Sequence, residues 1–353
     1  GGAIDAALLN AQGYIDIRFN PSGGKTLDPA SIMDPSNPSL GEFTLVGTAT
    51  SGVTIQNALV TRVGSTNTFR YPFTGSFGTG TVQIQFVAGS FADNSYSNVT
   101  ETESFVILGP TAALAGDAAD GVVGLSVLAV AEHRYIDIAF TGTSGNSITE
   151  TSIDGNEIKF KMADGQEHNP RGPPSKNADG TFRYFLPDAL ALEPGVVQVI
   201  FQPGAWTDSA GYANVAATAA FSIIEPTADL IDPLPFSSVD RAGLTARGYF
   251  LVKFNDPSGK GLTGIDGDEI ALDGAGKGNV AMGVVENVGN NVYKYKFSGQ
   301  FADGLVQVKF LAGKWQDNDG NVNRAETEEV AVISQSPSFE IVVEGALELH
   351  GGG

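Results

Sequence analysis

The sequence repeats itself three times, and this repetition constrains the fold more than any other feature. Four short blocks occur in the same order in every repeat. In the first repeat they are Tyr14–Phe19, Thr68–Tyr71, Val82–Phe86 and Gly89–Asp93. They return as Tyr135–Phe140, Thr181–Tyr184, Val197–Phe201 and Gly204–Asp208, and again as Tyr249–Phe254, Val292–Tyr295, Val306–Phe310 and Gly313–Asp317. Four blocks in one fixed order establish a tandem repeat.

The period of about 110 residues suits a domain that folds alone and is too long for one unit of a solenoid. We predict three domains, 1–109, 110–225 and 226–335, followed by the start of a further β segment at 336–353. Pro110 and Pro226 each open a Pro-Thr-Ala junction directly after a strand-like run, which predicts short, stiff linkers. The first repeat has no such segment. We therefore expect its first strand to be missing, which leaves an open sheet edge for a partner segment or a filament neighbour.

The pattern of apolar side chains predicts strands. In 14–19 apolar residues alternate with polar ones, and the same period of two recurs in 82–86 and 306–310. Turn signals such as Asn-Pro-Ser-Gly and Asp-Gly separate these runs. The predicted fold class is all-β, with three tandem Ig-like antiparallel β-sandwich domains in an elongated array and almost no helix.

Composition and missing motifs exclude several classes of function. The chain has 20 Lys and Arg against 40 Asp and Glu, so its net charge of -20 repels nucleic acid and anionic membranes. With no Cys and three His, it cannot form disulfides or Cys-bound zinc, and a His-based centre is disfavoured. The longest nearly apolar run, Val122–Ala131, is about half of a membrane span. Hydrolase-elbow, zinc-protease and phosphate-loop motifs are absent. We predict that the chain is not an enzyme, does not bind nucleic acid and has no membrane span.

The loop 317–323 of the third repeat has the strongest metal-binding character. Asp317, Asp319, Asn321 and Asn323 place side-chain oxygens at alternate positions, and Ca²⁺ takes about six to eight oxygen ligands. An EF-hand is excluded because the glycine stands at the wrong position and the flanks have strand patterns. Either the loop binds calcium, or its Asp, Asn and Gly residues only build a hydrogen-bonded hairpin turn.

A second calcium candidate is the acidic turn Asp266-Gly-Asp268-Glu269. Its carboxylates repel one another unless a cation or solvent screens them. Its counterparts in the other repeats are Asp154-Gly-Asn-Glu157 and, in the first repeat, Asp28 and Asp34. A solvated loop is the alternative interpretation.

Four further aspartates are weaker candidates for the same ion. Asp93 and Asp208 occupy the position of Asp317 in the other repeats. Asp16 and Asp137 lie on the polar side of a strand, although aspartate is a poor strand former. Each of these two either ligates an ion or pairs with a cross-strand arginine, Arg70 or Arg183.

The block Tyr-Ile-Asp-Ile-x-Phe, the Thr-Phe-Arg-Tyr strand and the Phe/Trp-x-Asp loop that ends in Asn resemble tandem bacterial Ig-like repeats. Such repeats occur in giant secreted and surface proteins, including adhesins of the RTX type. The resemblance implies an extracellular or cell-surface stalk whose loops or junctions bind calcium. The third repeat departs from the pattern because Leu251 replaces the strand aspartate.

Three functional hypotheses follow. The first is a non-catalytic spacer in a large bacterial surface or secreted adhesin-like protein, stiffened by calcium, whose partners are neighbouring Ig-like domains. The second is an array of carbohydrate-binding modules attached to an extracellular enzyme, in which Trp206 or Trp315 stacks on surface glycans. The third is an S-layer, filament or phage structural component.

Overall fold

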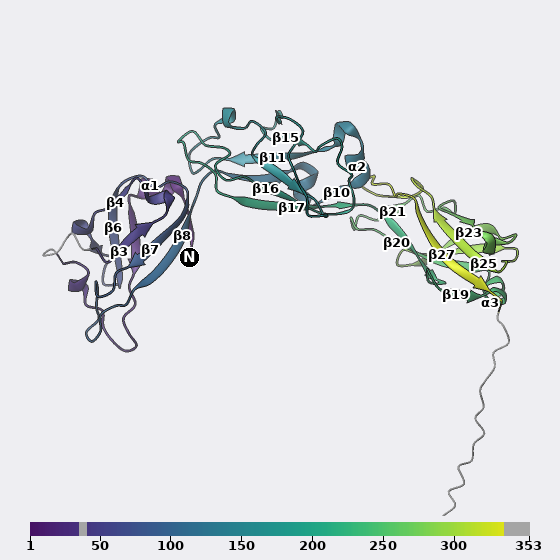
Figure 1. The fold of residues 1–353 in the computed structure, drawn as a ribbon, viewed down its shortest axis with the longest axis horizontal. Coiled ribbons are helices and arrows are strands. Elements are labelled where there is room, and N and C mark those ends of the chain that lie inside the picture. Colours follow the sequence, from purple (N-terminus) through teal and green to yellow (C-terminus); the bar gives the residue numbers. More distant parts are fainter. Residues whose placement is uncertain (35–40, 335–353) are drawn as a thin grey trace, which may run out of the picture. The chain divides into compact units, whose positions relative to one another are not determined.

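The computed structural model describes residues 1–34 and 41–334 (Figure 1). The chain forms two compact units. One contains Gly1–Val123 and Leu128–Ile223, and the other contains Gly124–Val127 and the chain from Ile224 onward. The first two repeats therefore share a unit, and the three predicted domain boundaries stay a prediction. The β segment predicted at 336–353 lies outside the described residues.

Each repeat contains two main sheets, and one of them has four strands in an equivalent order in all three repeats, with a fifth strand added in the second (Figure 1). In the first repeat this sheet consists of β1 (Ala3–Asp5), β8 (Glu101–Leu108), β7 (Gly80–Phe86) and β3 (Phe43–Val46). In the second it consists of β10 (Val122–Gly124), β17 (Ala217–Ile224), β16 (Gly195–Phe201), β12 (Ile158–Lys161) and β13 (Glu167–His168). In the third it consists of β19 (Ser238–Asp240), β27 (Glu326–Ile333), β25 (Gly304–Phe310) and β22 (Ile270–Asp273).

The other sheet carries the Tyr-Ile-Asp-Ile and Thr-Phe-Arg-Tyr blocks on adjacent strands. In the first repeat it consists of β2 (Tyr14–Arg18), β6 (Thr68–Gly75) and β4 (Val53–Ile55), with β5 (Thr61–Arg62) also on β6. In the second it consists of β9 (Thr111–Ala115), β11 (Tyr135–Thr141), β15 (Phe182–Phe185) and β14 (Ser175–Lys176). In the third it consists of β18 (Thr227–Asp232), β20 (Tyr249–Asn255), β24 (Val292–Ser298) and β23 (Ala281–Gly289), and β21 (Leu262–Thr263) pairs with β26 (Gln316–Asp317) nearby.

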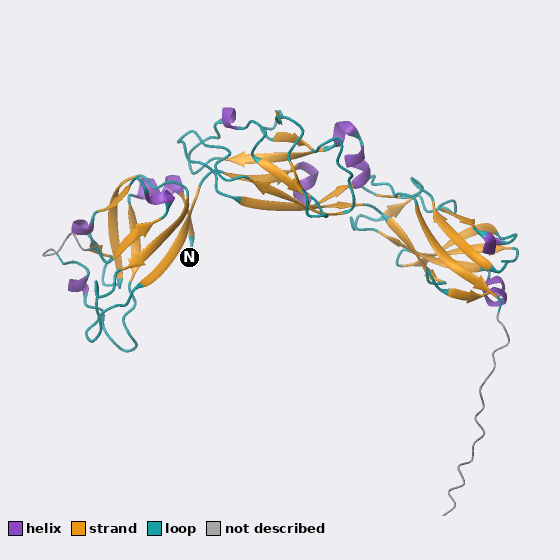
Figure 2. Ribbon diagram, viewed as in Figure 1, coloured by secondary structure: helices purple, strands orange, loops and turns teal. Residues whose placement is uncertain are grey.

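The predicted alternation places one side of each strand in a core. In β2, Ile15 and Ile17 are buried, whereas Asp16 and Arg18 are exposed. In the third repeat, buried side chains from both sheets, such as Val252 of β20 and Val308 of β25, belong to one hydrophobic cluster. Two sheets that share one core make a β-sandwich, and strands far outnumber helices (Figure 2). The predicted all-β Ig-like fold class is confirmed.

Two features of the sandwich differ from the simple antiparallel prediction. β1 and β19 pair in parallel with the last strand of their repeat, β8 and β27 respectively. Short helices also interrupt the strands. Within the described part of the chain they are α1 (Ala6–Gln12), α2 (Leu125–Ala129), α3 (Arg241–Arg247) and the 3-10 turns Pro29–Ser31, Thr48–Thr50, Asn57–Leu59, Gly116–Asp120, Ala131–His133, Glu150–Ser152 and Ala275–Lys277.

Local capping explains α1 and α3. Asp5 accepts a hydrogen bond from Leu8 N at 3.0 Å, and Gly13 ends α1 in the left-handed region with φ 74°. Asp240 and Gly248 have the same roles in α3. Both helices have seven residues and follow the short parallel strand of their repeat. A helix this short shows little periodicity, so its caps are its main sequence signal.

Candidate functional site

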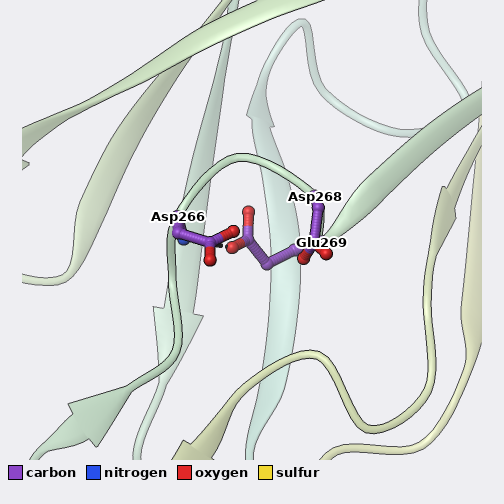
Figure 3. A group of neighbouring side chains, drawn as sticks. All are labelled: Asp266, Asp268 and Glu269. Atoms are coloured by element: carbon purple, nitrogen blue, oxygen red, sulfur yellow. Dashed lines mark hydrogen bonds between the residues drawn. The ribbon is translucent and has the colours of Figure 1, made fainter.

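The acidic turn between β21 and β22 is the most concentrated group of potential metal ligands. One carboxylate oxygen from each of Asp266, Asp268 and Glu269 lies within 4.8 Å of the others. Figure 3 shows these side chains on a single turn, where Asp266 and Asp268 are exposed and Glu269 is buried. Within residues 1–34 and 41–334, no other group of three or more acidic, His or Cys residues comes this close.

Protein donors already engage two of these carboxylates. Gly267 N donates to both oxygens of Glu269 at 3.0 Å, and the Tyr295 hydroxyl donates to Oε2 at 2.5 Å. Asp268 accepts a hydrogen bond from Lys314 Nζ at 2.5 Å, and this bond raises the pKa of Lys314. The turn is therefore held by internal contacts, and Asp266 is its least restrained carboxylate.

The pair of Glu269 and Tyr295 joins the two sheets of its repeat. Glu269 directly precedes β22 in one sheet, and Tyr295 belongs to β24 in the other. Burial, together with the hydrogen bond to Glu269, raises the pKa of Tyr295. A buried carboxylate that lacked these donors would be strongly destabilising.

The same pair occurs in every repeat, and the sequence interpretation missed it. Tyr184 donates to Glu157 at 2.7 Å, and Tyr71 donates to Glu42 at 2.9 Å. The backbone carbonyl of each glutamate also accepts an equivalent hydrogen bond. The donor is Val87 N in the first repeat, Gln202 N in the second and Leu311 N in the third, at 2.8–2.9 Å. The sequence signal was a glutamate directly before a strand: Glu42-Phe43, Glu157-Ile158 and Glu269-Ile270.

The first-repeat counterpart of the acidic turn therefore differs from the prediction. We expected Asp28 and Asp34 to take this place, but the register assigns it to Glu42. Asp28 instead caps the 3-10 turn Pro29–Ser31 by accepting from Ala30 N at 3.0 Å. Burial raises the pKa of Glu42.

In the loop 317–323, Asp317 is fully buried and its oxygens accept hydrogen bonds. Oδ1 accepts from Asp319 N at 3.0 Å and from Asn321 N at 2.9 Å, and Oδ2 accepts from Asn321 Nδ2 at 2.8 Å. The side chain of Asp319 is exposed. These bonds are the ones expected from the second interpretation of this loop, a hydrogen-bonded hairpin turn.

Asn323 has a different role from the one predicted, because its side chain binds backbone groups at the base of the loop. Its Oδ1 accepts from Lys314 N at 2.9 Å and Trp315 N at 3.2 Å, while Nδ2 donates to Leu311 O at 2.9 Å and Arg324 O at 2.8 Å. We call this arrangement the asparagine clamp. It recurs at Asn98 and at Asn214, which accept from Phe91 N and Trp206 N and donate to the carbonyls of Val87, Val99, Gln202 and Val215.

Asp93 and Asp208 fasten their loops in the way Asp317 does. Asp93 accepts from Ser22 N at 2.9 Å and from Tyr96 N at 2.8 Å, and the hydrogen bonds from Ser22 lower its pKa to about 2. Burial acts to raise the pKa of Asp208, but hydrogen bonds from Thr143 and the loop backbone outweigh it and lower the pKa. Each aspartate also pairs through its backbone, in a β-bridge, with the segment that follows the first repeated block of its repeat (14–19, 135–140 or 249–254). The pairs are Leu27–Asp93, Ile148–Asp208 and Leu262–Asp317.

The two strand aspartates lie in ion pairs with the expected arginines. Asp16 accepts two hydrogen bonds from Arg70 at 2.9 Å, and Asp137 accepts two from Arg183 at 2.9 Å. Each guanidinium also stacks on a tyrosine of the neighbouring strand, 3.6 Å from the Tyr14 ring centroid in the first repeat. In the third repeat, where Leu251 replaces the aspartate, Lys294 stands in register opposite it.

The tryptophans considered for glycan stacking are buried. Trp206 is 1% exposed and Trp315 is 2% exposed. Trp206 packs edge-on against Phe140 with ring centroids 5.0 Å apart, and Trp315 packs in the same way against Phe254. These rings close the core beside the asparagine clamp and present no face to a sugar, so the hypothesis that they stack on glycans is wrong.

No protein-family model and no curated protein matches the chain. Among solved structures, the chain is similar to the Escherichia coli adhesin FdeC, with 15% identity and a TM-score of 0.22, over 88% of each chain. It is similar to a tetra-tandem repeat of the extending region of a large adhesion protein, with 17% identity and a TM-score of 0.23, over 76% of this chain and 61% of that one. It is also similar to domains 1–6 of the surface layer protein SbsC, with 13% identity and a TM-score of 0.22, over 95% of this chain and 54% of that one. These values are too low to assign a function. No helix in the described segments has the length and apolar character needed to cross a membrane.

Proposed function

We propose that the chain is a non-catalytic structural region of a long extracellular or cell-surface protein, in which tandem Ig-like repeats act as spacers. The observation that carries this proposal is the threefold recurrence of the glutamate–tyrosine pair and the asparagine clamp. The glutamate and asparagine side chains that recur at matching positions form internal hydrogen bonds. The glutamate–tyrosine bonds join the two sheets of a repeat, and the bonds of the asparagine clamp hold its loop closed. A repeat that is held together by such internal bonds is suited to act as a spacer between its neighbours.

Small-angle X-ray scattering tests the spacer role. A compact globule of 353 residues has a radius of gyration of about 20 Å. A stiff array of three sandwiches should exceed that value by half or more, and its maximum dimension should approach three domain lengths. A radius of gyration near 20 Å would overturn the proposal.

Calcium stiffening is a second proposal, and the grouping of Asp266, Asp268 and Glu269 favours this turn as its place. Ca²⁺ binds carboxylate oxygens from closely spaced residues, and here three such oxygens lie within 4.8 Å of one another. The ion would have to replace Lys314 as the partner of Asp268. The second repeat offers an internal control, because Asn156 stands where the third repeat has Asp268.

A melting experiment tests the calcium proposal. Binding to the folded state stabilises it by about 2.7 kcal/mol at a hundredfold excess over Kd. Millimolar calcium should therefore raise the melting temperature of the third repeat by several degrees, and Asp266→Asn with Asp268→Asn should remove the rise. The same melt on Asp317→Ala with Asp319→Ala tests the loop 317–323. An unchanged melting temperature on adding chelator to the unaltered chain would contradict calcium binding at both places.

A further inference from the structure

The loop 208–214 of the second repeat contacts the first repeat, and we call this contact the first joint. Asn10 Nδ2 of α1 donates to the Tyr212 hydroxyl at 2.9 Å, and the half-buried Tyr212 ring packs against the hydrophobic cluster of the first repeat. Asn10 is itself held in place, because its amide accepts from Phe77 N at 2.8 Å and donates to Phe77 O at 2.9 Å. The first joint therefore has a fixed polar group on one side and an aromatic ring on the other.

The loop 317–323 makes a corresponding contact, which we call the second joint. Val322 N donates to Ser126 Oγ of α2 at 3.2 Å. Asn321 lies against Gly124, the last residue of β10, where a Cβ would overlap the side-chain oxygen of Asn321. The segment that carries Gly124 and Ser126 belongs to the second repeat in the sequence, yet it groups with the compact unit that contains the third repeat.

The two joints use equivalent elements of their repeats. On the preceding side each uses the helix, α1 or α2, that follows the short strand paired with the last strand of its repeat. Each also uses the residue directly before the junction proline. Gly109 has no room for a Cβ because Ala213 O lies where it would stand, and Glu225 forms an ion pair with Arg324 at 2.7 Å. Contacts that recur through the same elements, although the residues differ, indicate an interface built into the repeat.

The residue two positions before the clamp asparagine differs between the joints, and its partner differs with it. Tyr212 has this position in the first joint and Asn321 has it in the second. The tyrosine reaches the Asn10 amide through its hydroxyl, whereas the shorter Asn321 side chain lies against Gly124, which leaves it room. Asn321 is only 5% exposed and its Nδ2 donates to Asp317 Oδ2 at 2.8 Å, so it cannot turn away without losing this bond. Each loop is therefore shaped for the residues that it contacts.

We infer that the loop 208–214 is a docking surface for α1 of the first repeat, and that the loop 317–323 receives the α2 segment in the equivalent way. The first joint holds the first two repeats, which share a compact unit, in one fixed relation. Repeats linked by the chain alone would move relative to one another. The repeated aspartates support this docking, because Asp208 and Asp317 accept the backbone N–H of the docking residue of their loop. The inference rests on the proposed spacer function, since fixed joints make a tandem array stiff.

Spin-label distance measurements on the full chain test the first joint. The chain has no native cysteine, so Gln83→Cys in β7 and Gln198→Cys in β16 place two labels at exposed strand positions of the first and second repeats. The unaltered joint should give a narrow distribution of label-to-label distances. Tyr212→Ala removes the ring and the hydroxyl but keeps the backbone N–H that bonds to Asp208. It should widen the distribution by about twofold, because repeats without an interface move freely.

Two further variants control this measurement. Tyr212→Phe removes only the hydroxyl and should give an intermediate width. Tyr96→Ala makes the same change at the equivalent position of the first repeat, which is 63% exposed and belongs to neither joint, and should leave the width unchanged. A broad distribution in the unaltered chain, an unchanged width in Tyr212→Ala, or equal broadening by Tyr96→Ala would overturn the inference.

Scattering separates this outcome from the spacer function. An extended chain whose label distances are broad contradicts the first joint alone, whereas a radius of gyration of about 20 Å contradicts the spacer itself.

Hydrogen exchange tests the second joint. Ser126→Ala should raise the exchange rate of the Val322 amide by about tenfold, because this N–H loses an acceptor that lies 196 positions away in the sequence. Asn321 N, which Asp317 holds, should keep its protection. Ser126→Thr retains a hydroxyl and should restore the slow exchange of Val322. An unchanged rate at Val322 in Ser126→Ala would overturn the second joint.

Discussion

At the scale of single residues, the buried polar side chains discussed above form hydrogen bonds with other side chains and with the backbone of the same repeat. The buried Glu269 is stable because Gly267 and Tyr295 supply its hydrogen bonds, and Asn323 uses both ends of its amide. Such groups stabilise the fold only as complete sets, since a buried donor or acceptor that loses its partner costs more than the bond contributed.

Removing the tyrosine hydroxyl should therefore be costly. We expect Tyr295→Phe to lower the free energy of unfolding of the third repeat by about 1.5–3 kcal/mol, because it leaves a buried carboxylate short of a donor. Urea unfolding followed by Trp315 fluorescence, in a Trp206→Phe background, measures this repeat. Tyr293→Phe is the matched control, because its hydroxyl accepts an exposed bond from Asn287 and should change stability by less than about 0.5 kcal/mol. Equal effects of the two substitutions would contradict the pairing.

The buried Glu42 should make the free energy of unfolding of the first repeat depend on pH. Burial raises its pKa in the folded state, so the stability it contributes is fully present below the unfolded pKa of about 4.3 and is lost as pH rises through the folded value. A glutamine side chain at this position would not titrate. The unfolding free energy of Glu42→Gln should therefore improve relative to the unaltered chain between pH 4 and pH 7. A difference that stays constant over this range, measured by urea unfolding, would show that Glu42 is not buried as a charge.

At the scale of elements, the strands were predictable and the links between them were not. Alternation within 14–19 or 306–310 identifies a strand because one side faces a core. The glutamate–tyrosine pair joins residues that are 26–29 positions apart and belong to opposite sheets, and no local pattern reports which side chains meet across a sandwich. The helices α1 and α3 were not predicted for another reason, because they are too short to show a periodic apolar stripe. Their only sequence signals are the capping residues, Asp5 and Gly13 for α1 and Asp240 and Gly248 for α3.

The asparagine clamp can be tested within one loop. Asn98→Asp should destabilise the first repeat by about 1–3 kcal/mol, because a carboxylate oxygen would replace the amide that donates to the carbonyls of Val87 and Val99. Asn94→Asp in the same loop alters an exposed side chain and should have little effect. Hydrogen exchange of the loop amides, compared between the two variants, shows whether the loop has opened. Equal protection in both would show that the clamp is dispensable.

At the scale of the whole molecule, charge and repetition act together. Tandem sandwiches keep the same polar bonds while their surfaces vary, so the surface can carry a net charge of -20 without disturbing a core. The calcium candidates Asp266 and Asp268 lie on this acidic surface, where any cation lowers repulsion. Screening and specific binding therefore both predict stabilisation by calcium, and they must be separated.

Matched ionic strength separates the two effects. Raising ionic strength from 0.01 M to 0.15 M shortens the Debye length from about 30 Å to about 8 Å, so sodium chloride should raise the melting temperatures of all repeats by weakening repulsion among the excess carboxylates. Calcium chloride at the same ionic strength should give the same rise in the first and second repeats. If the turn at Asp266 binds calcium, the third repeat should gain several further degrees, and magnesium should reproduce little of that gain because it demands a tighter octahedral shell. Differential scanning calorimetry of the full chain, repeated with Asp266→Asn and Asp268→Asn, measures both contributions. Identical curves in the two salts would leave screening as the whole effect.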